Sequence, residues 1–421
     1  MKDNLHNVQL SDGVHLQIHS TSKFRTQTIC VSFIWPLDNS KLLLSYLLSF
    51  LLFDSCAEYS DKKQVLKRMD DLYGASISVV NDPFGTTDRL RFTMSCIESF
   101  SEEEALFDEM LKTLAEFIFR PRLEHGEFPQ SMFRECLQQA KIAIAEERDD
   151  PYTMTLEQAN LHYGGSVAAK ILPDLAEFDR VLSADCAAQW QWILDNARID
   201  IQILGNVETE HALNCVRERF PFAGRVSDFP LRRKYHGKES FITMEKEMPQ
   251  SHLVMLYETG ITVRDPLLHA LMLGNGLFGA LPVSLLFQNI REARGLCYSI
   301  DTRILPNDGV LRAAAAAHSS KIDAVREGIE AELEKMKRGD FSDDLLDSAK
   351  RMTISGLRIS EDIPSAILSS DYRRVLNPRT MTIEQRIRKY QSITKEEIAE
   401  AFANLKLCTV AVLREGGSHD L

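Results

Sequence analysis

Apolar residues fill positions 41–53 (KLLLSYLLSFLLF) almost without interruption, which predicts a helix buried on most of its sides. The run is too short to cross a bilayer as a helix. A β-branched, strand-like run at 28–35 precedes it, and a second helix at 61–72 follows. Two further strand-like runs, at 76–80 and 89–95, come next. The pattern predicts a compact α/β unit built around the apolar helix.

Three more elements complete this unit. Ser101 and Glu104 form a capping box, which predicts a helix that runs through Phe119 and stops at the following proline. Residues 130–147 predict another long helix. The run IDIQILG at 199–205 predicts the strand that closes the unit.

The second half of the chain repeats the first. SHLVMLYETG at 251–260 matches TICVSFIWPL at 28–37, and VLRAAAAAH at 310–318 matches RLRFTMSC at 89–96. Solenoid repeats recur every 20 to 50 residues or so, whereas this repeat spans about half of the chain. It therefore predicts two copies of one α/β domain.

A change in composition marks the boundary between the copies. Prolines and glycines become frequent between the two halves, and a basic cluster (RRK) lies at 232–234. We predict domains at 1–222 and 241–421, joined by a linker at 223–240. The basic cluster is predicted to be a solvated loop, with a docking patch as the alternative.

The order of elements around the apolar helix resembles the opening of the pitrilysin-type zinc peptidases, the inverzincins, whose relatives include mitochondrial processing peptidase. In that family the helix carries H-x-x-E-H, in which two histidines bind zinc and the glutamate is the general base. The alignment places Tyr46 and Phe50 at the histidine positions and Ser49 at the glutamate position. A tyrosine, a serine and a phenylalanine in these places cannot form the zinc site or activate its water.

The third ligand of the family, a glutamate on a later helix, is also replaced. The alignment places Ile142 there, and Glu135 falls on an acidic position that is not itself a ligand. The resemblance implies an α+β fold of two tandem homologous domains of the pitrilysin/processing-peptidase type, each a mainly antiparallel sheet packed by helices. We therefore expect a degenerate zinc site in the first domain and no metal on this chain.

One family motif in the second half is retained. The segment LMLGNGLFGALPVSLLFQNIREARGLCYSI resembles the family's glycine-rich loop followed by an arginine and, seven residues later, a tyrosine, here Arg291 and Tyr298. The resemblance implies that these two residues and the loop glycines Gly274 and Gly276 bind substrate. A guanidinium can hold a peptide carbonyl, and a phenol can donate to a developing oxyanion. Arg291 on its R-E-A-R segment could instead be a surface ion-pair former, with the nearby Arg294 predicted to be structural.

Charge and cysteine content bear on the partners of the chain and on the state of its thiols. The formal charge of −12 argues against a nucleic-acid partner or an anionic membrane surface. The eight cysteines show no C-x-x-C pairing, which favours buried free thiols over disulfides or a metal site. We find no secretion signal and no run of membrane-spanning length, so we expect a cytoplasmic protein.

Three alternative sites remain open on the sequence alone. His15 and His19 share a face if they lie on a strand and could bind a metal together, although exposed or edge-strand histidines are the favoured interpretation. The glycines at 274–279 fit G-x-G-x-x-G, but a helical run precedes them where a dinucleotide fold needs a strand. A thiol enzyme using Cys56 or Cys297 is the third alternative.

Several bacterial members of the family work as pairs, and the chain is similar to the noncatalytic partner subunits of Gram-positive paired peptidases. The resemblance implies a noncatalytic subunit of a heterodimeric zinc metallopeptidase. It would contribute Arg291 and Tyr298 to a composite peptide-cleaving site, and a homologous H-x-x-E-H subunit would hold the zinc. The alternative is a catalytically inert homodimeric scaffold or peptide-binding module, and a homodimer could also form when the chain is alone.

Overall fold

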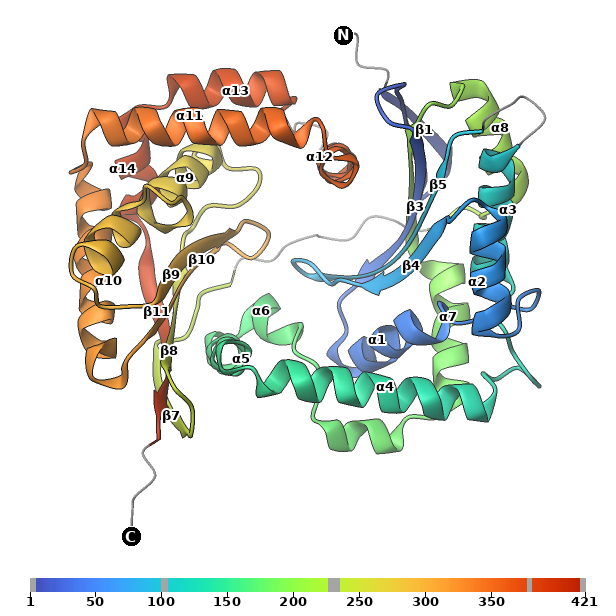
Figure 1. Cartoon of the computed structure of the whole chain (residues 1–421), viewed down its shortest axis with the longest axis horizontal. Coiled ribbons are helices and arrows are strands. Elements are labelled where there is room, and N and C mark those ends of the chain that lie inside the picture. The colour runs from blue at the N-terminus through green and yellow to red at the C-terminus, as the bar shows by residue number, and fades with distance from the viewer. Residues whose placement is uncertain (1–4, 100–104, 226–234, 377–380, 417–421) are drawn as a thin grey trace. The chain divides into compact units, whose positions relative to one another are not determined.

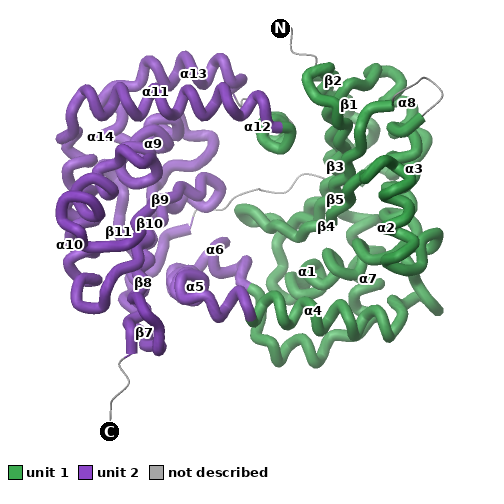
Figure 2. Tube along the Cα trace, in the orientation of Figure 1, with its two compact units in different colours: residues 1–145, 172–231, 364–378 green, residues 146–171, 232–363, 379–421 purple. Residues whose placement is uncertain are grey.

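The computed structural model describes residues 5–99, 105–225, 235–376 and 381–416. The chain forms two compact units, and neither is continuous in sequence (Figure 2). Unit 1 comprises residues 1–145, 172–231 and 364–378; unit 2 comprises 146–171, 232–363 and 379–421. Each unit contains one β-sheet packed by helices (Figure 1).

Unit 1 is built on a six-stranded sheet of order β1-β2-β6-β3-β5-β4. Its strands are β1 (Leu5–Ser11), β2 (Val14–Ser20), β3 (Thr26–Pro36), β4 (Ser76–Asn81), β5 (Thr87–Ile97) and β6 (Arg198–Gly205). β2 and β6 are parallel, and the other neighbours are antiparallel. Its helices are α1 (Leu42–Leu51), α2 (Lys62–Asp71), α3 (Leu106–Phe119), most of α4 (Gln130–Asp149), α7 (Ser183–Asn196), α8 (Thr209–Arg219) and α12 (Pro364–Leu376), with the 3-10 turns η1 (Asn39–Lys41) and η2 (Leu175–Arg180).

Unit 2 is built on a five-stranded sheet of order β7-β11-β8-β10-β9. Its strands are β7 (Ser240–Lys246), β8 (Ser251–Glu258), β9 (Ser299–Leu305), β10 (Val310–Ala317) and β11 (Lys406–Glu415). β7 and β11 are parallel, and the rest are antiparallel. Its helices are α5 (Pro151–Tyr163), α6 (Gly165–Ala169), α9 (Leu268–Asn275), α10 (Ile322–Arg338), α11 (Asp343–Ser360), α13 (Ile383–Ser392) and α14 (Lys395–Ala403), with the π-helical turns η3 (Gly276–Ala280) and η4 (Phe287–Glu292) and the 3-10 turn η5 (Ser319–Lys321).

The two sheets confirm the sequence repeat and the predicted fold class. The order β2-β6-β3-β5-β4 in unit 1 has the same pairing directions as β7-β11-β8-β10-β9 in unit 2. Strand β1 is the extra strand of the first sheet, at its edge. Both sheets are mainly antiparallel and packed by helices, as expected.

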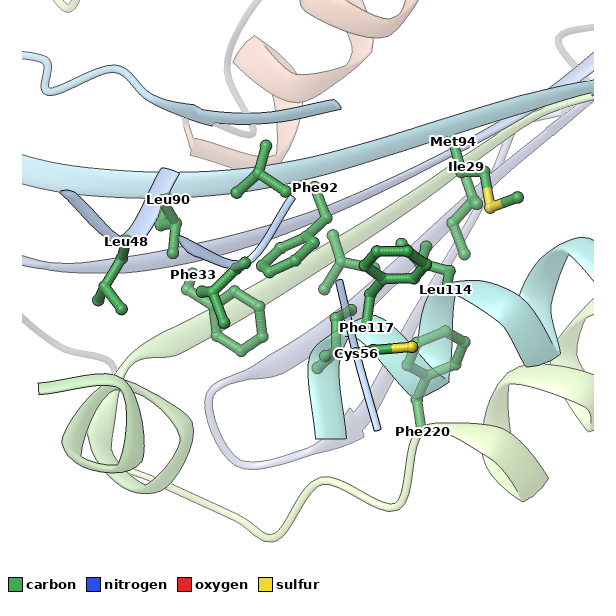
Figure 3. Close-up of a cluster of buried hydrophobic side chains, with 14 of the residues drawn as sticks. Ile29, Phe33, Leu48, Cys56, Leu90, Phe92, Met94, Leu114, Phe117 and Phe220 are labelled. Carbon is green, nitrogen blue, oxygen red and sulfur yellow. The ribbon is translucent and has the colours of Figure 1, made fainter. Parts of the chain in front are cut away.

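Hydrophobic burial explains the apolar helix. Within α1, Leu43, Leu47, Leu48 and Leu51 are buried in the large core of unit 1. Figure 3 shows part of this core, where Leu48 lies among side chains of the sheet such as Phe33 and Leu90. Transfer of one leucine side chain from water into such a core contributes about 1.5–3 kcal/mol. The central apolar run is therefore held in the core of this unit by burial of its leucines.

The second face of each sheet is covered by helices from the other half of the sequence. In unit 2, Ala159 and Tyr163 of α5 pack with Val254 of β8 and Ala411 of β11. In unit 1, α12 supplies a buried side chain, Leu368, to a small cluster with the sheet. Helix α5 of the predicted first domain therefore belongs to unit 2, and α12 of the predicted second domain belongs to unit 1. The predicted domains 1–222 and 241–421 follow the sequence repeat, and their boundaries stay a prediction.

Two sequence predictions fall wholly or partly on residues that the structure does not describe. These are the capping box of Ser101 and Glu104 and the linker with its basic cluster at 232–234. The described helix α3 begins at Leu106 and ends, as predicted, at Phe119. Across the described ranges, the helices are too short or too polar to cross a membrane.

The histidines of β2 correct one expectation. Strand β2 lies inside the sheet, between β1 and β6, so His15 and His19 are not edge-strand residues. Each is partly buried and pairs with a buried carboxylate: His15 Nδ1 lies 3.1 Å from Asp200 Oδ1, and His19 Nδ1 lies 2.8 Å from Asp371 Oδ2. The two histidines therefore have separate partners, His15 on β6 and His19 on α12, and each is satisfied by its own carboxylate.

Candidate functional site

One half-buried face of α1 carries Tyr46, Ser49 and Phe50, the residues aligned with the family's two histidines and its general base. Tyr46 and Phe50 are one helical turn apart, and their rings meet edge to face with centroids 5.3 Å apart. Ser49 turns its hydroxyl back to the helix, where Oγ donates to the carbonyl of Tyr46 at 2.7 Å. An aromatic pair of this geometry contributes about 0.5–1.5 kcal/mol beyond burial. The residues at this face do not fit a zinc ion, because two rings replace the imidazoles and the hydroxyl replaces the base.

A pocket of about 610 Å³ opens beside this face. It is lined by residues of α1 and the segment after it, of α2, of the edge strand β4, and of α4: Ser49, Phe50, Phe53, Asp54, Lys62, Val65, Leu66, Ile77, Ser78, Val79 and Gln139. Most of these side chains are apolar, and the edge of the sheet forms one wall. Ile142, aligned with the third ligand, is one turn beyond Gln139 on α4 and is 48% exposed.

A lysine carries the positive charge in this region. Lys62 Nζ lies 3.0 Å from Asp54 Oδ2 and 3.4 Å from Glu135 Oε1. The hydrogen bond to Asp54 raises the pKa of Lys62, so the group is an ammonium at neutral pH. Glu135, which aligns with the acidic position of the family pattern, therefore forms an ion pair with Lys62. No sequence pattern marks this ammonium, because Lys62 lies in an ordinary polar stretch at the start of α2.

Arg291 and Tyr298 lie on unit 2, in η4 and immediately before the edge strand β9. The guanidinium of Arg291 stacks over Phe287, 4.8 Å from the ring centroid, and its Nε is 3.8 Å from Glu292. Its side chain is 42% exposed, and Tyr298 is 56% exposed. The backbone N–H of Tyr298 donates to Ala316 O at 2.8 Å, which fixes this residue to β10. Both polar ends are thus presented to solvent from anchored backbone.

The loop glycines are in a different environment. Gly274 is buried, and a Cβ there would lie 2.4 Å from a ring carbon of Phe402 on α14. At Gly276 a Cβ would lie 3.0 Å from Leu281. Close helix packing therefore accounts for Gly274, while a substrate role for the two glycines stays a prediction. The glycines at 274–279 follow helix α9 rather than a strand, which excludes the Rossmann arrangement.

The thiols lie in surroundings that weaken them as nucleophiles. All eight cysteines are free and buried. Burial raises the pKa of Cys297 to about 11, with the charge of Arg291 acting in the opposite direction, and burial also raises the pKa of Cys56. A thiolate is the reactive form of cysteine. The environment therefore argues against a thiol enzyme built on either residue.

The fold and this site define a class: two sheet-and-helix units in which the α1 residues aligned with a peptidase's zinc site do not fit zinc. Residues 191–353 match the family model of the peptidase M16 inactive domain. The predicted family resemblance is therefore confirmed, and the match includes the segment that carries Arg291 and Tyr298.

The chain is also similar to curated proteins described as metalloproteases or zinc proteases. The chain is 23% identical to the "probable inactive metalloprotease YmfF" of Bacillus subtilis (strain 168), over 96% of this chain and 97% of the relative. It is 24% identical to the "uncharacterized zinc protease YmxG" of the same bacterium, over 48% of this chain and 49% of the relative.

Solved structures share the whole fold. A conserved protein from Enterococcus faecalis V583 superposes with a TM-score of 0.90 at 25% identity, covering 99% of this chain and 100% of that one. A peptidase M16 inactive domain from Pseudomonas fluorescens superposes with a TM-score of 0.80 at 16% identity, with the same coverage of both chains. The second likeness shows the fold alone.

Proposed function

We propose that this chain is the noncatalytic subunit of a heterodimeric zinc peptidase. A homologous subunit with an intact H-x-x-E-H helix would hold the zinc and the general base. This chain would contribute Arg291 and Tyr298 to a composite site for an extended peptide.

The observation that carries the proposal is the contrast between the two units. On α1, at the positions aligned with the family's histidines and base, Tyr46 and Phe50 pack against each other and Ser49 hydrogen-bonds to the helix backbone. In unit 2, by contrast, an arginine and a tyrosine of the family motif are exposed on anchored backbone. Both side chains are more than one third exposed, so each polar end can reach a ligand from solvent.

The relatives add independent support. One bacterium, Bacillus subtilis, has both a relative described as an inactive metalloprotease and a relative described as a zinc protease. An organism with both kinds of chain has the components from which a mixed pair could be assembled.

The chemistry of the two side chains suits a peptide. The guanidinium presents fixed N–H donors to a backbone carbonyl or carboxylate, and the phenol donates where negative charge develops on the attacked carbonyl. A zinc ion on the partner subunit would supply an activated water and a Lewis acid for the scissile carbonyl. An extended peptide can also pair through its backbone with a free sheet edge, and β4 at the edge of the first sheet borders the pocket beside α1.

The test compares peptide cleavage by three preparations: this chain alone, a homologous H-x-x-E-H subunit from the same genome alone, and the mixture. Metal content and particle mass are measured for each. We expect turnover only in the mixture, with the peptidase zinc on the H-x-x-E-H subunit. Cleavage by this chain alone, or full activity of the partner alone, would refute the composite site.

Point variants assign the roles within the mixture. Tyr298→Phe should lower kcat by about 10²–10³-fold, as loss of an oxyanion donor does. Arg291→Ala should chiefly raise KM, and Arg291→Lys should recover part of the loss. Arg294→Ala, also exposed on the same segment, is the matched control and should leave both constants unchanged. If Arg291→Ala and Tyr298→Phe left every activity unchanged, the inert scaffold or peptide-binding module would be the better description.

A further inference from the structure

Three potential metal ligands meet on unit 1 outside the α1 face, where α8 packs against α3. Asp108 lies in the first turn of α3, and His211 and Cys215 lie on α8. The two α8 residues are four positions apart, so they project from the same side of the helix. Their ligand atoms all lie within 4.8 Å of one another, and no other group of three or more His, Cys, Asp or Glu side chains in the described ranges meets this criterion.

The distances are close to those of a tetrahedral zinc site. His211 Nε2 is 2.9 Å from Asp108 Oδ1, Cys215 Sγ is 3.3 Å from the same oxygen, and Cys215 Sγ is 3.6 Å from His211 Nε2. Zinc bonds of about 2.0 Å to nitrogen and oxygen and about 2.3 Å to sulfur place tetrahedral ligand atoms roughly 3.3–3.5 Å apart. Shifts of a few tenths of an ångström would therefore bring all three atoms onto one ion.

The same distances do not suit a cysteine–histidine–aspartate relay. In such a relay one ring nitrogen faces the nucleophile and the other faces the carboxylate. Here Asp108 Oδ1 and Cys215 Sγ are both close to the same nitrogen of His211, and Nδ1 is 3.9 Å from the sulfur. The three ligand atoms surround one point, as a bound cation requires.

The surroundings hold the ligands and leave one side open. Cys215 is 8% exposed and packs in the unit 1 core, which fixes the sulfur. The ring of Phe107 lies 6.0 Å from the ring of His211. The side chain of His211 is 50% exposed, so an ion can enter from solvent and keep a water molecule as its fourth ligand. A mixture of nitrogen, sulfur and oxygen ligands favours zinc-like ions over magnesium or calcium.

We propose that Asp108, His211 and Cys215 bind one zinc-class divalent cation that joins the start of α3 to α8. Without the metal, the thiol of Cys215 donates its proton to Asp108 in a hydrogen bond. When the metal binds, it replaces this proton, which passes to solvent. The site uses none of the α1 positions Tyr46, Ser49 and Phe50, so it does not depend on the proposed peptidase role.

The test uses the full chain, freed of metal with a chelator and kept under reducing, oxygen-free conditions. Zinc is titrated to obtain affinity and stoichiometry, and cobalt(II) is titrated as a spectroscopic probe. We expect one ion per chain, a thiolate-to-cobalt charge-transfer band and the intense visible bands of a four-coordinate site. Zinc should also raise the unfolding temperature, because it binds the folded chain in preference to the unfolded one.

Variants locate the ion. His211→Gln and Cys215→Ser should each weaken binding by at least about 100-fold, the upper end of the loss seen when a group behind a ligand is removed. Cys215→Ser should also abolish the charge-transfer band. The controls His162→Gln, an exposed histidine on α5, and Cys297→Ser should bind as the parent does.

The proposal fails if less than half an equivalent of zinc binds, or if His211→Gln binds zinc as tightly as the parent chain. The half-exposed position of His211 makes that variant decisive even if Cys215→Ser does not fold. Because the readouts are binding, spectrum and unfolding temperature, the result is independent of peptide cleavage.

Discussion

His19 and Asp371 form a hydrogen-bonded pair at 2.8 Å although 352 positions separate them in the sequence. His19 lies on β2 of the first sheet, and Asp371 lies on α12, a helix from the second half of the sequence. Two buried glutamines of the sheet add hydrogen bonds to the same helix: Gln17 Nε2 donates to Asp371 O at 3.3 Å, and Gln202 Nε2 donates to Leu368 O at 3.0 Å. Polar contacts therefore select where α12 docks.

The first prediction concerns this docking. Asp371→Ala removes the acceptor of His19 and should lower the free energy of unfolding by about 1–3 kcal/mol, the cost of an unsatisfied buried polar group. Urea unfolding followed by circular dichroism measures the change. Glu400→Ala, at an exposed position of α14, is the control and should stay within about 0.5 kcal/mol of the parent. Equal stability of Asp371→Ala and the parent would mean that α12 docks without this pair.

A second prediction concerns a variant that carries the family's zinc-site residues at the aligned positions. The variant Tyr46→His, Ser49→Glu, Phe50→His and Ile142→Glu regains the family's ligands and base on α1 and α4. Made in a Cys215→Ser background, so that zinc at the site proposed above does not contribute, it should bind one zinc per chain.

The matched control for this experiment leaves Ile142 unchanged. With only two of the three protein ligands it should bind zinc at least about 10-fold more weakly. The exposed position of Ile142 makes its replacement well tolerated. Equal zinc binding with and without Ile142→Glu would show that α4 presents another residue to α1.

A third prediction concerns pH and His269 on α9. Burial, and then the charges of Arg386 and Lys389, lower the pKa of His269 from about 6.5 to about 4. The folded protein therefore favours the neutral ring, while the unfolded chain takes up a proton below about pH 6.5. Stability from this residue is fully present above that pH and declines as the pH falls toward 4, by an amount on the order of 3 kcal/mol.

Urea midpoints measured between pH 7 and pH 4 would reveal this dependence. His269→Leu should flatten the curve in that window, because it removes the group that takes up the proton. His162→Gln, which changes an exposed histidine, should preserve it. An unchanged slope in His269→Leu would assign the acid sensitivity to other groups.

A fourth prediction concerns the thiols. Burial raises the pKa of Cys136 and Cys186 to about 12 and that of Cys297 to about 11, so these groups are thiols rather than thiolates at neutral pH. We expect iodoacetamide to label the folded chain far more slowly than the urea-unfolded chain, as followed by mass spectrometry. Rapid labelling of Cys56 or Cys297 at neutral pH in the folded chain would reopen the thiol-enzyme alternative.

Local patterns predicted much of what the structure contains. The apolar run at 41–53 predicted α1 and its burial, because a nearly continuous apolar segment has no polar face to expose. The repeat of strand segments predicted the two equivalent sheets. The residue types at Tyr46, Ser49 and Phe50 also lead us to expect no zinc on α1, because ligand chemistry depends on residue type, and this expectation stays a prediction.

Tertiary structure alone decided which elements meet. The sequence of α5 shows that Ala159 and Tyr163 are apolar, but not that they pack against β8 and β11 of the other half. The full sequence likewise does not indicate that Lys62 pairs with Asp54 and Glu135. Nor does it indicate that Asp108 lies beside His211 and Cys215. Composition and periodicity fix what each face of an element can bury, because these properties are local. The partner that covers a face depends on chain connections between distant residues, and only the folded chain specifies those.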